Sequence, residues 1–168
     1  MSPAVQPSPL VRLRPVASGD LPALFEFQLD PESNALAGTR PRDRAGFDAI
    51  FDGILGSRPD ADPGPRVVAR AILADGVLAG SISIFPQDGE PSVGYWIARA
   101  HWGRGIATRA IGLLLAEAGV RPVHAQVRVG NTASVRALER NGFVTTGQEW
   151  CPGTDRYIEG EVRFMRRP

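Results

Sequence analysis

The stretch GYWIARAHWGRGIATRAI, residues 94–111, changes its pattern of side chains near its middle, and this change decides the fold. Its first part belongs to an aromatic segment, residues 93–98, that is typical of a strand. From Gly105 onward the residues are rich in Ala and Leu and favour a helix, which we expect to end at Gly119. The stretch therefore predicts a strand that leads through a glycine turn into a helix.

The glycine turn has the chemistry of an anion-binding loop. The start of a helix leaves several backbone N–H groups without partners, and the helix dipole adds partial positive charge there. Gly103 and Gly105 have no Cβ that would keep a ligand from the backbone, and Arg104 and Arg109 can donate charge-assisted hydrogen bonds. The turn is suited to a pyrophosphate, although a sharp bend alone would also explain its glycines.

The remaining elements surround this turn in a regular order. Strands are predicted at residues 11–16, 67–73, 77–85, 93–98, 123–129, 143–150 and 156–165, and helices at residues 18–29, 44–55, 105–119 and 131–142. Asp75-Gly76 predicts a hairpin turn, DPESN at residues 30–34 is expected to break the first helix, and residues 57–66 are expected to form a loop. A helix between the fourth and fifth strands permits a parallel crossover, while the other neighbours are typical of hairpins. The order β-α-α-β-β-β-α-β-α-β-β predicts an α/β fold whose mixed sheet is mostly antiparallel.

Length and composition are those of one ordinary globular domain. The chain has 168 residues, of which 43% are apolar and 22% are charged. We expect a flexible, proline-containing arm over residues 1–9 and a single domain over residues 10–168. No segment has the roughly 18 consecutive apolar residues of a membrane-spanning helix, and the start lacks the pattern of a secretory signal. The sequence therefore predicts a cytoplasmic protein.

The charged and sulfur-containing residues exclude several kinds of chemistry. All 19 basic residues are arginine, so a phosphate loop that needs lysine and Schiff-base catalysis are both excluded. The formal net charge of +1 argues against nucleic-acid binding as the main role. Cys151 is the only cysteine, and His101 and His124 are the only histidines, so we expect neither an internal disulfide nor a metal site.

A second motif, NTASVRALERNGF at residues 131–143, follows the glycine turn after one more predicted strand. Together the two motifs resemble the GNAT superfamily of acetyl-CoA-dependent N-acetyltransferases, most of all its branch of ribosomal-protein N-terminal acetyltransferases. The loop of that family has the form Q/R-x-x-G-x-G/A, and Trp102, Gly105 and Ala107 hold its defined places here. Trp102 departs from Q/R, but the form H-W-G-x-G-x-A is typical of this branch. The resemblance extends over nearly the whole chain and implies a GNAT-like fold with one splayed pair of parallel strands.

The resemblance implies acetyl-CoA as the acetyl donor and assigns residues to its parts. The end of the strand before the loop is implied to offer backbone groups to the pantetheine arm, through Ile97, Ala98 and Arg99. The pyrophosphate is implied to lie on the loop and the first helical turn, at Gly103, Arg104, Gly105, Ile106, Ala107 and Thr108. In the second motif, Asn131 is implied to bond the pantetheine and Ser134 to lie near the thioester sulfur.

Acetyl transfer also needs a group that takes a proton from the amine. In many family members a carboxylate on the strand before the loop does this, usually through water, and Ser92 stands at the corresponding place here. Glu90 lies two residues earlier and shares the face of Ser92 if the strand extends that far. Both are candidate catalytic residues, with a solvated turn glutamate as the simpler interpretation of Glu90. Tyr95 is either a further polar group of the site or a core aromatic whose hydroxyl has a partner.

The departing thiolate needs a proton donor or another stabilising group. Many relatives place a tyrosine on the last helix for this purpose, but Leu138 occupies that position here. Ser134 is the remaining candidate, as in the branch that the chain resembles. Its hydroxyl can hydrogen-bond the sulfur, although a serine early in a helix is also an ordinary capping residue.

The leading hypothesis is an N-acetyltransferase that moves the acetyl group directly to a primary amine, a protein N-terminus or a small amine, in a ternary complex. Two alternatives stay open: a non-catalytic module that binds CoA or acetyl-CoA, and an acetyltransferase that acts on aminoacyl-tRNA. A homodimer is also left open. Acidic residues near the first helices can attract a cationic acceptor or simply form charged helix faces; these are Asp30, Glu32, Asp48 and Asp52.

Overall fold

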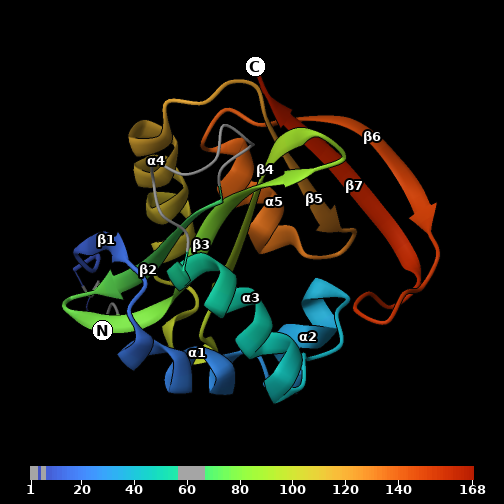
Figure 1. The fold of residues 1–168 in the computed structure, drawn as a ribbon. Coiled ribbons are helices and arrows are strands. Elements are labelled where there is room, and N and C mark those ends of the chain that lie inside the picture. The colour runs from blue at the N-terminus through green and yellow to red at the C-terminus, as the bar shows by residue number, and fades with distance from the viewer. Residues whose placement is uncertain (1–3, 5–6, 57–66) are drawn as a thin grey trace.

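The computed structural model describes residue 4, residues 7–56 and residues 67–168, which form a seven-stranded sheet with helices on both faces (Figure 1). The strands are β1 (Val11–Pro15), β2 (Val68–Ala74), β3 (Val77–Gln87), β4 (Glu90–Ile97), β5 (Val123–Arg128), β6 (Val144–Cys151) and β7 (Gly160–Arg167). The helices are α1 (Leu21–Phe27), α2 (Pro31–Ala37), α3 (Arg44–Gly56), α4 (Ile106–Ala118) and α5 (Thr132–Glu139). Short 3-10 turns at Ser18–Asp20 and Arg99–His101 lead into α1 and toward α4.

The order of the strands across the sheet is β1-β2-β3-β4-β5-β7-β6. Neighbouring strands are antiparallel except for β4 and β5, which run parallel with α4 as the crossover between them. Helices α4 and α5 pack on one face with the larger core cluster, and α1 and α3 pack on the other face with a smaller one (Figure 1). The predicted α/β fold with its mixed, mostly antiparallel sheet is confirmed.

Tight turns of the predicted kind set the register of the central strands. Asp75 and Gly76 join β2 to β3 with φ values of 50° and 80°, and the left-handed conformation at both positions matches the twist of a two-residue hairpin. Asp88 and Gly89 repeat this between β3 and β4, with φ values of 51° and 81°. Strand β4 therefore begins at Glu90, earlier than the sequence pattern indicates.

Glycines in the left-handed conformation also bound α4. Gly105 precedes the helix with a φ of 74°, and Gly119 follows it with a φ of 61° while its amide bonds back to the Leu115 carbonyl. One face of the helix is buried against the sheet, through Ile106, Ala110, Ile111, Leu114 and Leu115. Burial of this face fixes the direction in which the glycine loop points.

The predicted break of the first helix at residues 30–34 is confirmed, because α1 ends at Phe27, but the same segment also starts a further helix, α2, which was not predicted. Pro31 is the first residue of α2, and its fixed φ suits that position. Asp30 caps α2, since its carboxylate accepts a hydrogen bond from the Ser33 amide at 3.0 Å. The described part of the chain therefore has one more α-helix than the predicted order contains.

The last predicted strand, residues 156–165, starts too early. Strand β7 begins at Gly160, and the residues before it form a loop that contacts the segment after α2. Thr39 and Tyr157 form an isolated antiparallel bridge, and the Ile158 amide donates to the Gly38 carbonyl at 2.9 Å. Backbone groups of Tyr157 and Ile158 therefore pair with the segment after α2 and not with β6, so the hairpin of β6 and β7 is shorter than predicted.

The predicted loop at residues 57–66 lies outside the described residues, as does part of the predicted arm. Of that arm, the Pro9 carbonyl accepts a hydrogen bond from the Arg109 guanidinium at 2.6 Å. The division into an arm and one domain stays a prediction. In the part of the chain that the structure describes, no helix is long and apolar enough to cross a membrane.

Candidate functional site

An opening lies between the parallel strands β4 and β5. Ser92 and His124 form the single register pair between them, and the buried Ser92 hydroxyl donates to the His124 carbonyl at 3.2 Å. Beyond this pair, β4 stays bonded to β3 up to Ile97, and β5 stays bonded to β7 up to Arg128. The two strands therefore part toward their C-terminal ends, so the edges that face each other can pair with an extended ligand.

The glycine loop lies at the end of β4, beside this opening. Gly103 and Gly105 have φ values of 73° and 74°, and a Cβ on either glycine would meet no other atom within 4 Å. Among the residues that the structure describes, no side chain caps the first turn of α4. The N–H groups at the start of this helix therefore face open space, and the loop fits an anion such as a pyrophosphate.

Side chains around the loop hold its shape. The Trp102 indole donates to the Ile97 carbonyl at 2.9 Å and so fixes the loop against the end of β4. Arg104 lies 3.3 Å from the His101 ring and 3.5 Å from the Asp75 carboxylate. Arg109 is bonded to the N-terminal segment, as described above, so Arg104 is the arginine of this loop better placed to reach a phosphate.

Helix α5 contributes the other wall of the site. The Asn131 side chain caps this helix, because its oxygen accepts from the Ser134 amide at 3.4 Å. The Ser134 hydroxyl is in hydrogen-bond contact with the Tyr95 hydroxyl of β4, which also donates to the Ser134 carbonyl at 3.4 Å. Burial raises the pKa of the Tyr95 phenol, and its hydrogen bond to Ser134 opposes that shift. The structure thus brings Tyr95 and Ser134 together.

Glu90 and Ser92 lie at the opposite end of β4 from the loop, on one face of the strand. The Glu90 carboxylate is exposed and 3.9 Å from the His124 Nε2 atom. His124 shares their side of the sheet, because it is the register partner of Ser92. The pairing of Glu90 with His124 was not predicted, since only the register between β4 and β5 reveals it.

The acidic residues of the first helices are largely paired. Arg99, just after β4, forms ion pairs with Asp30 and Glu32, each at 3.1 Å. Asp48 pairs with Arg44 at 3.0 Å within α3. These contacts tie α2 to the end of β4, and they reduce the attraction that the acidic residues offer to a cationic acceptor.

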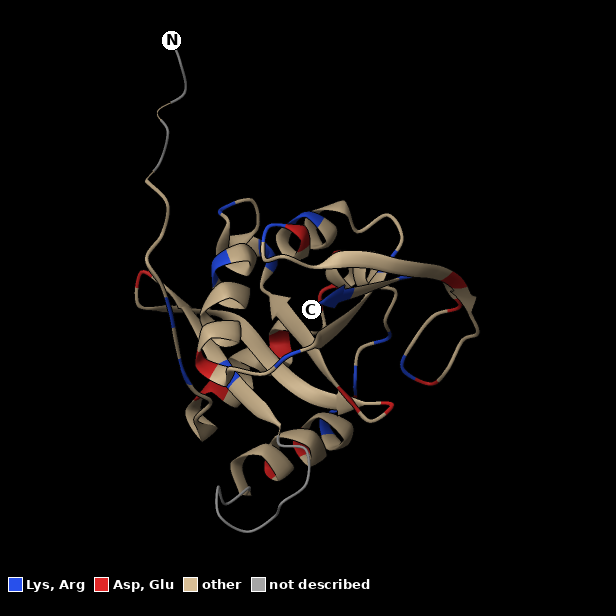
Figure 2. Ribbon diagram, turned by 90° about the horizontal axis from the view of Figure 1, so that it is seen from above, with Lys and Arg blue, Asp and Glu red and all other residues tan. Residues whose placement is uncertain are grey.

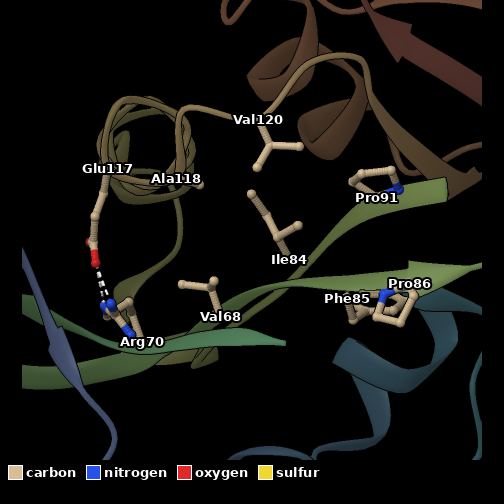
Figure 3. A pocket seen from close by; sticks show the side chains of 9 residues that line it. All are labelled: Val68, Arg70, Ile84, Phe85, Pro86, Pro91, Glu117, Ala118 and Val120. Carbon is tan, nitrogen blue, oxygen red and sulfur yellow. Dashed lines mark hydrogen bonds and ion pairs between the residues drawn. The ribbon is translucent and has the colours of Figure 1, made fainter. Parts of the chain in front are cut away.

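Figure 3 shows a separate pocket of about 430 Å³ between the C-terminal end of α4 and strands β2, β3 and β4. Arg70 and Glu117, joined by an ion pair, stand on its rim. Its other lining residues are Val68, Ile84, Phe85, Pro86, Pro91, Ala118 and Val120. None of the predicted site residues lines this pocket, which lies at the far end of α4 from the glycine loop.

Comparisons with known proteins agree with this geometry. The family model of the acetyltransferase (GNAT) domain matches residues 11–144, whereas no curated protein sequence gives a match. Among solved structures, Mycobacterium smegmatis RimJ in complex with a CoA disulfide is 25% identical, with a TM-score of 0.73 over 95% of this chain and 82% of that chain.

Two further solved structures share the fold. RimL, a ribosomal L7/L12 α-N-protein acetyltransferase in complex with coenzyme A, is 20% identical, with a TM-score of 0.69 over 94% of this chain and 93% of that chain. Spermidine N-acetyltransferase from Vibrio cholerae, in complex with CoA and spermine, is also 20% identical, with a TM-score of 0.71 over 93% of this chain and 94% of that chain.

The family model covers most of the chain, so the chain belongs to the GNAT acetyltransferase family. The protein is therefore an acetyltransferase, and its likeness to RimJ and RimL confirms the predicted resemblance to ribosomal-protein N-terminal acetyltransferases. The CoA in the solved relatives agrees with acetyl-CoA as the predicted donor substrate.

Proposed function

We propose that the protein transfers the acetyl group of acetyl-CoA directly to a primary amine, on a peptide N-terminus or a small molecule, with both substrates bound together. The opening between β4 and β5 beside the glycine loop is the observation that carries this proposal. It offers free strand edges for a thin, extended ligand and an anion site at one end of them.

The donor fits along this opening. The pantetheine arm would pair with backbone groups of Ile97, Ala98 and Arg99, and the Asn131 amide nitrogen would bond it from α5. The pyrophosphate would bind the N–H groups from Gly103 to Thr108, with Arg104 beside them. The open space at the left-handed glycines and the uncapped helix start support this assignment.

Ser134 and Tyr95 would act on the departing sulfur. As the amine nitrogen bonds to the acetyl carbon and the carbon–sulfur bond breaks, the Ser134 hydroxyl gives its proton to the sulfur. Tyr95, in contact with Ser134, can resupply that proton. Leu138 is 1% exposed in the core, so the hydroxyl that many relatives place there would come from the facing strand instead.

Glu90 would take the proton of the amine through water. The His124 ring beside it would stabilise the Glu90 carboxylate or accept the proton from it. Both side chains are partly exposed, so water can reach them. Ser92 stays a candidate of a different kind. Its hydroxyl is committed to the His124 carbonyl, and this supports a role in setting where the strands part.

An assay of thiol release from acetyl-CoA, over a panel of amines and N-terminal peptides, tests the proposal. We expect at least one acceptor to raise release well above background hydrolysis. Tight CoA binding without release that depends on an acceptor would instead identify a non-catalytic binding module.

An acetyltransferase directed at aminoacyl-tRNA is less favoured by the charge distribution. In the view of Figure 2 basic and acidic segments are interspersed over the described residues. The net charge of +1 agrees with that picture. The cytoplasmic location and a homodimer stay predictions.

A further inference from the structure

We propose that the acceptor amine carries an oxyanion group, a carboxylate or a phosphate, which binds between Arg42 and Arg156. This inference rests on the proposed function and names the class of its acceptor.

Arg156 belongs to a loop that is built onto the segment after α2. The Arg40 amide donates to the Arg156 carbonyl at 2.8 Å, next to the bridge between Thr39 and Tyr157. The Arg40 side chain donates to the Thr154 carbonyl at 2.6 Å, and the Arg156 side chain donates back to the Arg40 carbonyl. The loop between β6 and β7 is therefore fixed in place by bonds from both segments.

Arg42 is anchored to the end of α1. The buried Gln28 side chain accepts from the Arg42 amide at 2.8 Å and donates to the Arg42 carbonyl at 2.9 Å. One residue earlier, the Phe27 carbonyl accepts from the Trp96 indole of β4 at 2.9 Å. Two contacts thus connect Arg42 to the end of the strand that leads into the glycine loop.

The other strand of the opening reaches the same region. Arg128, the last residue of β5, donates to the Ile158 carbonyl at 2.6 Å. Its guanidinium fills the space beside Gly38 and Gly160, where a Cβ would lie 2.1 Å and 1.5 Å from its atoms. The region around Arg42 and Arg156 is therefore attached to the C-terminal ends of both β4 and β5, beyond the pair at which these strands part.

The Arg42 and Arg156 side chains are partly buried, and the Arg156 guanidinium donates to the carbonyl of Arg40, two residues before Arg42. Burial lowers the pKa of both groups, the positive charge of Arg42 lowers that of Arg156 further, and the nearby Tyr157 phenol partly offsets both shifts. Across residues 7–56 and 67–168, neither group forms an ion pair with a carboxylate. The Arg156 Nε atom is buried without a hydrogen-bond partner.

Such an arrangement costs free energy unless a ligand compensates it. A partly buried cation is stabilised by an opposite charge, and a second cation in the same region increases the need for one. Guanidinium groups match the oxygens of carboxylates and phosphates with paired hydrogen bonds. Tyr157 is 51% exposed, so the cluster is open to solvent and an anion can enter from there. A polyamine, in contrast, would be repelled.

The test compares matched acceptors in the thiol-release assay and in calorimetric binding. The peptide amides Ser-Asp-Asp and Ser-Asn-Asn differ only in charge, and O-phosphoserine amide against serine amide tests phosphate as the source. The variants are Arg42→Gln, whose lost guanidinium forms no ion pair in the described chain, and Arg156→Lys, which keeps the charge. Arg12→Gln, exposed on β1, is the control.

We expect the wild type to favour one anionic acceptor over its neutral match by about 10- to 100-fold in kcat/KM. Arg42→Gln should abolish this preference and leave both the turnover of the neutral acceptor and the CoA affinity unchanged. Arg156→Lys should keep part of the preference, and the control Arg12→Gln should keep all of it. Equal turnover of anionic and neutral acceptors by the wild type, or a preference that survives in Arg42→Gln, would overturn the inference.

If the proposed function is wrong, no acceptor will cause thiol release from acetyl-CoA, which is a different result from those above. Calorimetry then decides the inference by itself. Binding of an anionic amide to the wild type but not to Arg42→Gln supports it, and absence of binding to the wild type overturns it.

Discussion

The Tyr95 hydroxyl on β4 contacts the Ser134 hydroxyl on α5, although 39 residues separate them in the chain. The contact joins the strand that ends at the glycine loop to the helix that begins at Asn131. Because burial raises the pKa of Tyr95, its phenol stays protonated at neutral pH and can donate toward Ser134. The helix cap is made by Asn131, so the Ser134 hydroxyl is available for a role other than capping.

The first prediction concerns this pair. Ser134→Ala should lower kcat by about 100-fold or more, with little change in the KM for acetyl-CoA, because it removes the proton donor to the sulfur. Tyr95→Phe should lower kcat less than Ser134→Ala does, since the Ser134 hydroxyl remains. Steady-state thiol release measures both effects. Thr132→Ala removes an exposed hydroxyl from the same helix, and a loss of kcat equal to that of Ser134→Ala would contradict the role of Ser134.

The second prediction tests the anion site. Gly105→Glu should abolish acetyl-CoA binding in calorimetry, because its carboxylate would meet the pyrophosphate. The left-handed backbone strains any side chain there, so Gly119→Glu is the matched control. Its φ of 61° gives a similar strain and the same charge at the other end of α4. Normal affinity in Gly105→Glu, or equal losses in both variants, would refute the assignment of the loop.

Local signals in the sequence predicted the parts of this site that short segments determine. The Asp75-Gly76 turn and the end of α4 at Gly119 depend on backbone conformations that few other residues adopt, so both were visible in the sequence. The same holds for the glycine loop. Pro31 shows the limit of such signals, because a proline typical of a helix break is here the first residue of a new helix.

Contacts between distant segments could not be predicted in this way. Tyr157 pairs with Thr39, and beside this pairing Arg156 is bonded to Arg40 while β7 begins only at Gly160. Glu90 meets His124 only because of the register between parallel strands. Periodicity places a residue on a face of its element, but it does not select the partner that packs against that face.

The third prediction concerns the close approach of β3 and β4. A Cβ on Gly80 would lie 1.9 Å from the Trp96 carbonyl oxygen, which is backbone and cannot rotate away. Gly80→Ala should therefore lower the free energy of unfolding by about 1–3 kcal/mol, measured by urea denaturation. Gly147→Ala in β6 meets no atom within 4 Å and should be nearly neutral. Equal stability of the two variants would show that the strands can move apart without cost.

The last prediction concerns the ion pair that precedes α1. Asp20 is buried and bonded to Arg14 at 2.6 Å and 2.7 Å, and to the Ala17 amide at 2.8 Å. The hydrogen bonds from Arg14, followed by that from Ala17, hold the pKa of the Asp20 carboxyl below its usual range. A lowered pKa stabilises the fold above the pKa of the unfolded carboxyl, near 4, and this stabilisation is lost as the pH falls through the folded value.

Asp20→Asn should therefore destabilise the protein at pH 7 by about 1–2 kcal/mol, since Arg14 is partly exposed and keeps some hydration. The difference from the wild type should shrink as the pH falls below about 4, in urea denaturation repeated from pH 7 to pH 3. Asp48→Asn breaks the exposed pair with Arg44 and should change stability by less than about 1 kcal/mol. A difference between Asp20→Asn and the wild type that stays constant over this pH range would show that the Asp20 charge does not stabilise the fold.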